Sequence, residues 1–380
     1  MLVKAVRMQA AGVGSVRQVV ERAGGAAAQL ADIEEVTAYQ HDNHELLIQQ
    51  FFKADRSTML ALAENRHITL AKLNKAITDV VNAFAQLDVV NAWGDGSSVG
   101  TDGTQVDTYI DNLLAETSIR YGGFGRIAYH YVSDNYIALF SRFVPCGVWE
   151  AIYIIDGLLA NASEVQPKTV HADTQGQSFP VFTLAHLFGF DLMPRIRNWK
   201  GLTFFQHTDQ VTYHHIDSLS RGEGGNRNVI AWELVEKMWP DLMRVAISIR
   251  EGRLNSVTLL RRLGSHSRKN EIYRAFREVG RSVRTVALLR FLADPALRRR
   301  ITAVTNKVEG FNGFSAWLRF GNDPAEQEKM IKFNSLLANC VIFHTALDMT
   351  DVLRQLLAEG WQPEQGSDSP PPTSRSCRPI

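Results

Sequence analysis

The sequence predicts an α/β protein, in which one sheet domain is preceded and interrupted by helices. Three observations support this class. Both ends of the chain carry apolar residues at three- and four-residue steps, which is typical of helices. A Gly- and Ser-rich stretch of β-formers begins at Val89, and after it strands alternate with helices to about residue 206. Strands followed by alternating strands and helices indicate an α/β sheet.

Residues 1–88 form the predicted helical N-terminal segment, because HELLIQQFF and the residues after it keep a helical apolar period without proline. The sheet-containing domain is expected from residue 89 to about 360. Its first strands are predicted in VVNAWGDGSSVGTDG and, as a hairpin around Ser133–Asn135, in RIAYHYVSDNYIALFSRFVPC. The elements predicted after them are a helix in WEAIYIIDGLLAN, a strand and turn in VHADTQG, a helix ending near Phe190, and a strand in RIRNWKGLTFFQ.

The pattern is almost wholly helical from about residue 228 to 320. Asp294 followed by Pro295 predicts a helix start there, because proline suits the first turn of a helix. Residues 361–380 are rich in proline and serine and poor in apolar side chains, so we expect a disordered tail. The tryptophans Trp93, Trp149, Trp199 and Trp232 are expected in the core.

Charge is balanced overall but not along the chain. The 41 Lys and Arg residues nearly match the 40 Asp and Glu residues, whereas residues 244–307 hold 16 basic and 4 acidic residues. Such a region suits a polyanion. Arg274, Arg277, Arg281 and Arg284 share one helical face, opposite Ile272, Phe276, Val279, Val283 and Val286; the alternative is a solvated surface helix. Further predicted phosphate-binding residues are Arg195, Arg197, Arg261, Arg262 and Lys307.

Other features exclude several classes. The three cysteines lie far apart, in neither a disulfide nor a zinc spacing. The adjacent His214 and His215 point in different directions and lack further ligands, which argues against zinc. No apolar run was expected to span a bilayer, so the sequence predicts a protein of the reducing cytoplasm without a membrane partner.

Acidic residues stand at three abrupt structural junctions. Asp95 and Asp102 lie in the Gly-rich strand segment, Asp173 follows a short strand, and Glu309 lies in NKVEGFNGF away from the apolar stripe of its helix. Three such carboxylates, with oxygen-only ligands, suit two Mg²⁺ or Mn²⁺ ions. The alternative is that all of them are solvated surface charges.

These motifs together resemble the catalytic region of the Tn3-family transposases. The similar segments run in order along the chain and are WGDGS, TDG, YHYVSD, IDGLL, HADTQG, FTLAHLFGFDLMPRIR, LLRRL, REVGR, DPALRRR and NKVEG. The resemblance implies a DDE enzyme with an RNase H-like mixed sheet and a large helical insertion at about residues 214–300. It assigns the catalytic, metal-binding carboxylates to Asp102, Asp173 and Glu309. Asp95 is the rival for the first position.

The resemblance also implies a function and partners. It predicts metal-dependent 3′-end nicking and strand transfer by a bacterial, nucleoid-associated enzyme. Its partners would be the terminal inverted repeats of the transposon, target DNA, and a second copy of the chain on paired ends. Two alternatives stay open, because most of the N-terminal region of this family has no counterpart here. One is an inactive remnant that binds DNA or interferes with a full-length transposase, and the other is a nuclease that cuts without joining.

Overall fold

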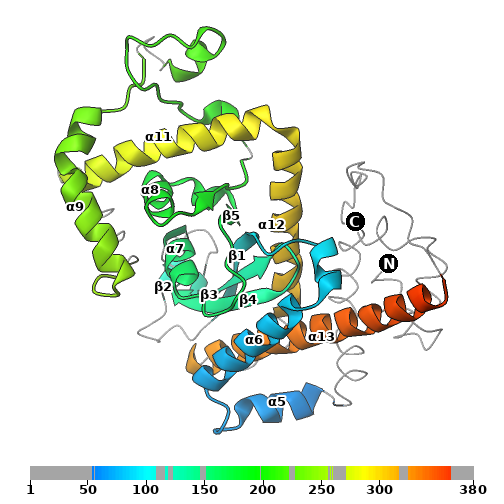
Figure 1. The fold of residues 1–380 in the computed structure, drawn as a ribbon. Coiled ribbons are helices and arrows are strands. Elements are labelled where there is room, and N and C mark those ends of the chain that lie inside the picture. The colour runs from blue at the N-terminus through cyan, green and yellow to red at the C-terminus, as the bar shows by residue number, and fades with distance from the viewer. Residues whose placement is uncertain are drawn as a thin grey trace.

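The computed structural model confirms a mixed α/β protein. It describes residues 54, 56–107, 116–118, 123–145, 151–196, 198–221, 227–255, 257, 259, 271–315 and 324–360. The predicted tail at 361–380 lies outside these residues, as does the predicted N-terminal segment before residue 54. Within them, one sheet lies at the centre and helices surround it (Figure 1).

The sheet combines an antiparallel half with a parallel half. Its strands are β1 (Ser98–Asp107), β2 (Glu116–Ser118), β3 (Gly123–Ser133), β4 (Ala138–Pro145), β5 (Thr169–Ala172) and β6 (Asp191–Leu192). β3 pairs antiparallel with β1, β2 and β4, whereas β5 pairs parallel with β1 and with β6. The parallel and antiparallel halves therefore meet at β1, the central strand.

Alternation along the strands assigns each side chain to one of two covered faces. Tyr131 of β3 contacts α7 (Ala151–Leu159), because its hydroxyl donates to the carbonyl of Tyr153 at 2.5 Å. On the opposite face, Gly100 of β1 meets α12 (Pro295–Ser315) so closely that a Cβ there would collide with Val308. Asp102 lies two residues after Gly100 and therefore faces α12.

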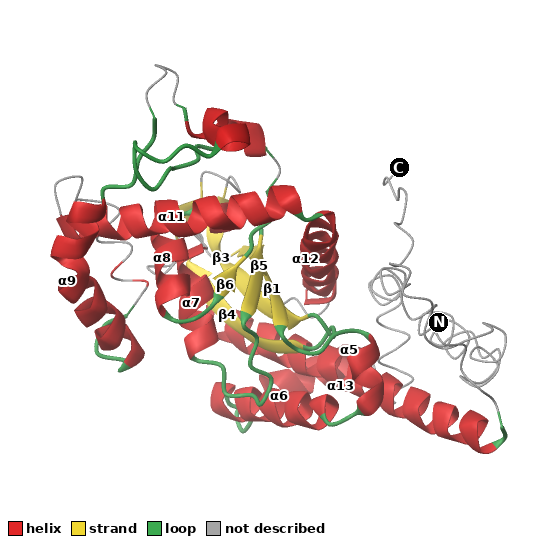
Figure 2. Ribbon diagram, turned by 45° about the horizontal axis from the view of Figure 1, so that its top comes forward, coloured by secondary structure: helices red, strands yellow, loops and turns green. Residues whose placement is uncertain are grey.

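The face toward α12 is completed by two helices from the ends of the described chain. α6 (Leu70–Ala85) and the long α13 (Pro324–Ala358) pack against each other and against β4, with α5 (Arg56–Glu64) beside α13 (Figure 2). α13 is long and apolar enough to cross a membrane, contrary to the expectation that no such run exists. In the fold its first half packs into the core, where Met330, Phe333 and Leu337 are buried against neighbouring residues.

The opposite face is covered by α8 (Phe179–Leu187), and α11 (Glu271–Ala293) packs over α8 with α9 (Trp232–Arg250) beside it. Gly280 of α11 lies against the carbonyl of Phe179, a contact that any Cβ would block. α12 begins at Pro295 as predicted, and the Asp294 carboxylate accepts from the N–H of Ala296 at 2.8 Å.

One predicted strand is wrong. RIRNWKGLTFFQ contains a single 3₁₀ turn, Trp199–Gly201, and a bridge at Gln206, whereas the strand of this region is Asp191–Leu192, just before it. β6 is only two residues long, and the helix-to-strand turn at Gly189, with φ +81°, precedes it directly. No alternating pattern marks so short a strand.

Candidate active site

Asp102 and Asp173 follow the last paired residues of two neighbouring parallel strands. The β1–β5 ladder runs from Ser98 and Thr169 to Thr101 and Ala172, so Asp102 and Asp173 are the next residues in the same register. Neighbouring strands lie about 4.8 Å apart. The backbones of the two residues thus lie side by side where the parallel pairing ends. Asp102 is not at a strand end, because β1 continues to Asp107 along β3.

Glu309 reaches the same region from α12. Asn312, three residues after Glu309, is only 8% exposed, and its Nδ2 donates to Oδ2 of Asp102 at 3.0 Å. Residues three apart are neighbours on a helix surface. Glu309 therefore lies one turn from the point at which α12 contacts Asp102, with its side chain 54% exposed.

Arg195 joins the end of β5 to Glu309. Its backbone N–H donates to the carbonyl of Ala172 at 2.7 Å, and its guanidinium donates to Oε1 of Glu309 at 3.3 Å. Ala172 directly precedes Asp173, so Arg195 spans from the second predicted carboxylate to the third. Arg197 lies outside the described residues, as do Arg261 and Arg262.

His130 is a buried neighbour that sequence reasoning missed. It is the cross-strand partner of Asp102, it is fully buried, and its ring lies 5.2 Å from that of Phe311 of α12. Burial lowers the pKa of His130 to about 3, so the imidazole is neutral at physiological pH. Asn312 was missed too, although its position three residues after Glu309 in NKVEGFNGF was a usable signal.

The ligand chemistry suits a hard divalent ion, but the carboxylates do not form a closed ligand set. Asp102, Asp173 and Glu309 offer the oxygen donors that Mg²⁺ and Mn²⁺ prefer. In the part of the chain that the structure describes, no group of three or more His, Cys, Asp or Glu side chains is close enough to hold an ion. Glu309 is instead paired with Arg195.

Asp95, the rival for the first carboxylate, lies before the opposite end of β1. Its Oδ1 accepts from the N–H of Ser97 at 2.9 Å, and hydrogen bonds from Ser97 lower the pKa of Asp95. Because β1 and β5 are parallel and Ser98 pairs with Thr169, Asp95 lies at the start of both strands. Asp173 lies beyond their far end.

Lys307 does not point toward the carboxylates. Its ammonium donates to the carbonyls of Asp134 and, at 3.5 Å, Trp93, and lies 3.9 Å from the centre of the Tyr136 ring. These residues lie in the β3–β4 turn and before β1, and burial lowers the pKa of Lys307 to about 8. Lys307 therefore binds the β3–β4 turn and the segment before β1, and its contact with a scissile phosphate stays a prediction.

The expected arginine ridge on α11 is largely packed against aromatic rings. Arg284 is 8% exposed, donates to the carbonyl of Thr203 at 3.0 Å, and lies 4.0 Å from the ring centre of Phe179. Burial lowers the pKa of Arg284 to about 10. Arg281 pairs with Glu278.

The remaining residues of that helix complete the correction. Arg281 also lies 4.8 Å from the ring centre of Phe205, and Arg277 lies 5.9 Å from that of Phe179. Arg274 is exposed. Val286, predicted on the packed face, is 48% exposed. The face predicted for phosphate therefore holds the helix to its neighbours, and Arg274 is the member that stays open to solvent.

Comparison with known proteins identifies the class as transposases. The family model of the Tn3 transposase DDE domain matches residues 47–367. The chain therefore belongs to the Tn3 transposase family, which confirms the resemblance seen in its motifs. No solved structure matches the chain.

Three relatives illustrate the similarity. The chain is 33% identical to the transposase for transposon Tn501 of Pseudomonas aeruginosa, over 66% of this chain and 25% of the relative. It is 29% identical to the transposase for Tn1546 of Enterococcus faecium, over 78% and 30%. It is 26% identical to the transposase for transposon gamma-delta of Escherichia coli, over 83% and 32%. The chain spans about a quarter to a third of these relatives.

Proposed function

We propose that this chain carries the catalytic domain of a replicative DNA transposase, with Asp102, Asp173 and Glu309 as its DDE residues. One observation carries the proposal. Asp102 and Asp173 continue the register of β1 and β5. Asn312 links Asp102 to the helix that carries Glu309, and Arg195 links Glu309 to Ala172, the residue before Asp173. The strand order supports an RNase H-like fold, because an antiparallel meander is followed by two parallel strands beyond β1.

The three carboxylates would hold two Mg²⁺ or Mn²⁺ ions, which when bound activate an attacking oxygen and stabilise the leaving 3′ oxygen. The residues of the chain act by positioning and charge. Asn312 fixes the rotamer of Asp102. Arg195 holds Glu309 before DNA binds and then turns to a phosphate, an exchange that costs little because exposed ion pairs are weak. Arg197, Arg261, Arg262 and Arg274 supply further phosphate contacts.

The partners follow from this activity. Transposition requires that the enzyme bind the terminal inverted repeats of its element and the target DNA, and we propose that two copies of the protein act on paired ends. The contacts of the phosphate-binding arginines are with the backbone and carry no sequence information. Recognition of a particular inverted repeat would come from other residues.

A plasmid that carries the element's own ends tests the proposed function. With Mg²⁺ or Mn²⁺ the chain is expected to nick the 3′ ends and join them to target DNA, and EDTA is expected to abolish both products. Nicks without joined products would indicate a nuclease. DNA binding without metal-dependent nicks would indicate a remnant that only binds DNA.

Replacing Asn312 by leucine is expected to slow cleavage about tenfold, because a hydrogen bond to a charged group contributes about 1.5 kcal/mol or more. The matched control is Asn82→Leu. Asn82 also reaches from a helix to a neighbouring element, where its Oδ1 accepts from the N–H of Glu164 at 2.8 Å.

Cleavage rate should be measured against Mg²⁺ concentration for both variants. A positioning role for Asn312 predicts a higher half-saturating Mg²⁺ concentration with unchanged DNA affinity in EDTA, whereas Asn82→Leu should match the natural chain in both. If the two variants had the same half-saturating Mg²⁺ concentration, Asn312 would have no role in positioning Asp102.

A further inference from the structure

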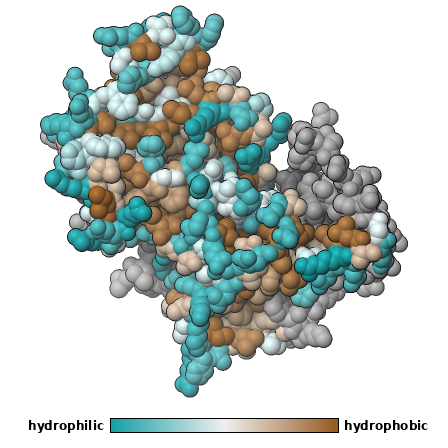
Figure 3. All heavy atoms as spheres, in the orientation of Figure 1, coloured by the Kyte–Doolittle hydropathy of each residue, from teal (hydrophilic) through white to brown (hydrophobic). Residues whose placement is uncertain are grey.

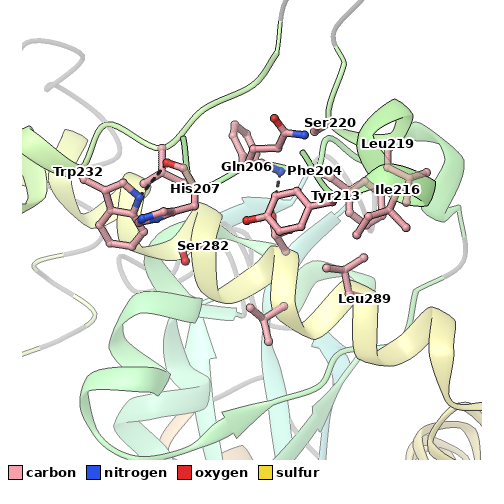
Figure 4. A pocket seen from close by; sticks show the side chains of 14 residues that line it. Phe204, Gln206, His207, Tyr213, Ile216, Leu219, Ser220, Trp232, Ser282 and Leu289 are labelled. Carbon is pink, nitrogen blue, oxygen red and sulfur yellow. Dashed lines mark hydrogen bonds between the residues drawn. The ribbon is translucent and has the colours of Figure 1, made fainter. Parts of the chain in front are cut away.

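A pocket of about 280 Å³ lies on the side of α11 that faces away from α8. Figure 4 shows its walls, which come from α11, from the start of α9 and from the segment that follows Leu202. The aromatic members of the lining are Phe204, Phe205, His207, Tyr213 and Trp232. Such a volume is at the small end of ligand pockets, which run from about 300 Å³ upward. It suits one planar group rather than a base pair.

The pocket exposes large apolar side chains. Tyr213 is 42% exposed, Trp232 is 37% exposed and Val286 is 48% exposed, although Trp232 was predicted in the core. Figure 3 shows apolar residues gathered near the junction between α11 and the upper part of the molecule. Nε1 of Trp232 already donates to the carbonyl of His207 at 3.1 Å, so the ring face is what Trp232 offers a ligand. The pocket is therefore rimmed by apolar side chains that solvent can reach.

A buried amide gives the pocket one specific polar feature. Gln206 lines the pocket and is 3% exposed, and its Nε2 donates to Oδ1 of Asp217 at 2.9 Å. The carboxylate of Asp217 can only accept here, because the N–H of Tyr213 also donates to it at 2.7 Å. The orientation of the Gln206 amide is thereby fixed, and within the described residues its buried Oε1 has no hydrogen-bond partner. Because Oε1 is itself buried, the amide fixes the wall of the pocket, and the exposed rings are the groups that a ligand can contact.

The wall that carries Gln206 is rigidly built. Asp217 forms an ion pair with Arg227 at 3.3 Å, and the Arg227 guanidinium also donates to the carbonyl of Asp209 at 2.7 Å. Ser220 donates its hydroxyl to the carbonyl of Asp217 at 2.8 Å. The 3₁₀ turn His214–Ser220 is thus held by its own polar contacts. The exposed rings therefore belong to a preformed site.

We propose that this pocket binds one unstacked nucleobase of a DNA strand. The proposal rests on the proposed function, because DNA is the substrate that would supply such a base. Aromatic rings stack on bases of any sequence, and Tyr213 and Trp232 offer such rings at the surface of the pocket. The pocket is tied to the candidate active site through α11, since Arg281 stacks on Phe205 and Arg284 stacks on Phe179 of α8. α8 begins six residues after Asp173.

The test is metal-free DNA binding by the full chain, measured in EDTA by fluorescence anisotropy. The probes are a short dye-labelled single strand of thymidylate and an abasic strand of the same length, which share a phosphate backbone. The natural chain is expected to bind the thymidylate strand about tenfold more tightly, since stacking one base is worth roughly 1–3 kcal/mol. Tyr213→Ala should reduce binding of thymidylate to the abasic level and leave abasic binding unchanged.

Two further variants serve as controls for the loss of an aromatic ring. Trp239→Ala removes an aromatic side chain of α9 that is also 42% exposed but does not line the pocket, and it should bind both strands like the natural chain. Tyr213→Phe keeps the ring and should retain the preference for thymidylate. A Tyr213→Ala protein with unchanged thermal unfolding excludes a folding defect.

Three results would overturn the proposal. Equal affinity of the natural chain for both strands would show that only the backbone is bound. A change in mass by light scattering on Tyr213→Ala, without DNA, would make the pocket a contact between protein chains. Failure of the natural chain to bind either single strand would also overturn the proposed base site, whereas the proposed function is decided separately by the plasmid nicking and joining assay.

Discussion

Asp173→Ala is expected to lower cleavage and joining of transposon-end DNA by at least about 100-fold, because a metal ligand contributes several kcal/mol to charge stabilisation in the transition state. Asp173 follows Ala172, the last residue of β5 that pairs with β1, so the parallel ladder holds its backbone in place. The measurement is single-turnover cleavage of end-labelled DNA in Mg²⁺. DNA affinity in EDTA should be retained.

The matched control is Asp191→Ala. Asp191 begins β6 in the same sheet, is half-exposed, and forms an ion pair with Arg290 at 3.4 Å. Exposed ion pairs contribute little to stability, so this variant should cleave within about twofold of the natural chain. Cleavage by Asp173→Ala at the natural rate would remove Asp173 from the catalytic residues, and equal losses in both variants would indicate a general effect of charge.

The parts of the fold that could be predicted are those with a strong local signal. The hairpin around Ser133–Asn135, the helix in WEAIYIIDGLLAN and the start of α12 at Pro295 all follow from periodicity and turn chemistry. The segment after Pro194 was predicted as a strand from β-forming residues alone. Its backbone is instead held by long-range contacts, such as the donation from the N–H of Phe205 to the hydroxyl of Thr285 at 3.2 Å.

The site shows the same division between local and long-range information. The spacing of Asp102, Asp173 and Glu309 required the family resemblance, and the pairing of β1 with β5 could not be deduced from either strand alone. The arginines of α11 share a helical face, as predicted, but the rings that cover Arg281 and Arg284 come from Phe205 and Phe179, far away in the chain. Helical spacing determines which residues share a face and says nothing about what covers that face.

The pocket could not be predicted from the sequence, because its residues lie far apart along the chain. Tyr213 and Trp232 lie 19 positions apart, and no motif connects them. The pocket wall near Tyr213 is held together by Asp217, whose carboxylate accepts from Gln206 and also forms an ion pair with Arg227. Buried polar networks of this kind specify a unique arrangement only after the chain has folded.

A direct comparison of Asp102→Ala with Asp95→Ala is expected to identify the first carboxylate. Asp102 is next to Asp173 across the β1–β5 ladder and accepts from Asn312, so its loss should lower cleavage by at least about 100-fold. Asp95 lies before the opposite end of β1, where it accepts from the N–H of Ser97. Its loss removes only a local turn contact, which contributes about 1 kcal/mol to stability.

Both variants should be assayed at saturating DNA and over a range of Mg²⁺ and Mn²⁺ concentrations, with thermal unfolding measured alongside. We expect Asp95→Ala to cleave within about threefold of the natural chain, with a slightly lower unfolding temperature. Asp102→Ala should also unfold at a lower temperature, because the buried Asn312 loses its hydrogen-bond acceptor. It should stay inactive at every metal concentration, because the lost ligand is not replaced by mass action. The reverse result, an inactive Asp95→Ala and an active Asp102→Ala, would require the chemistry to lie at the start of β1, far from Asp173, and would contradict the triad as a unit.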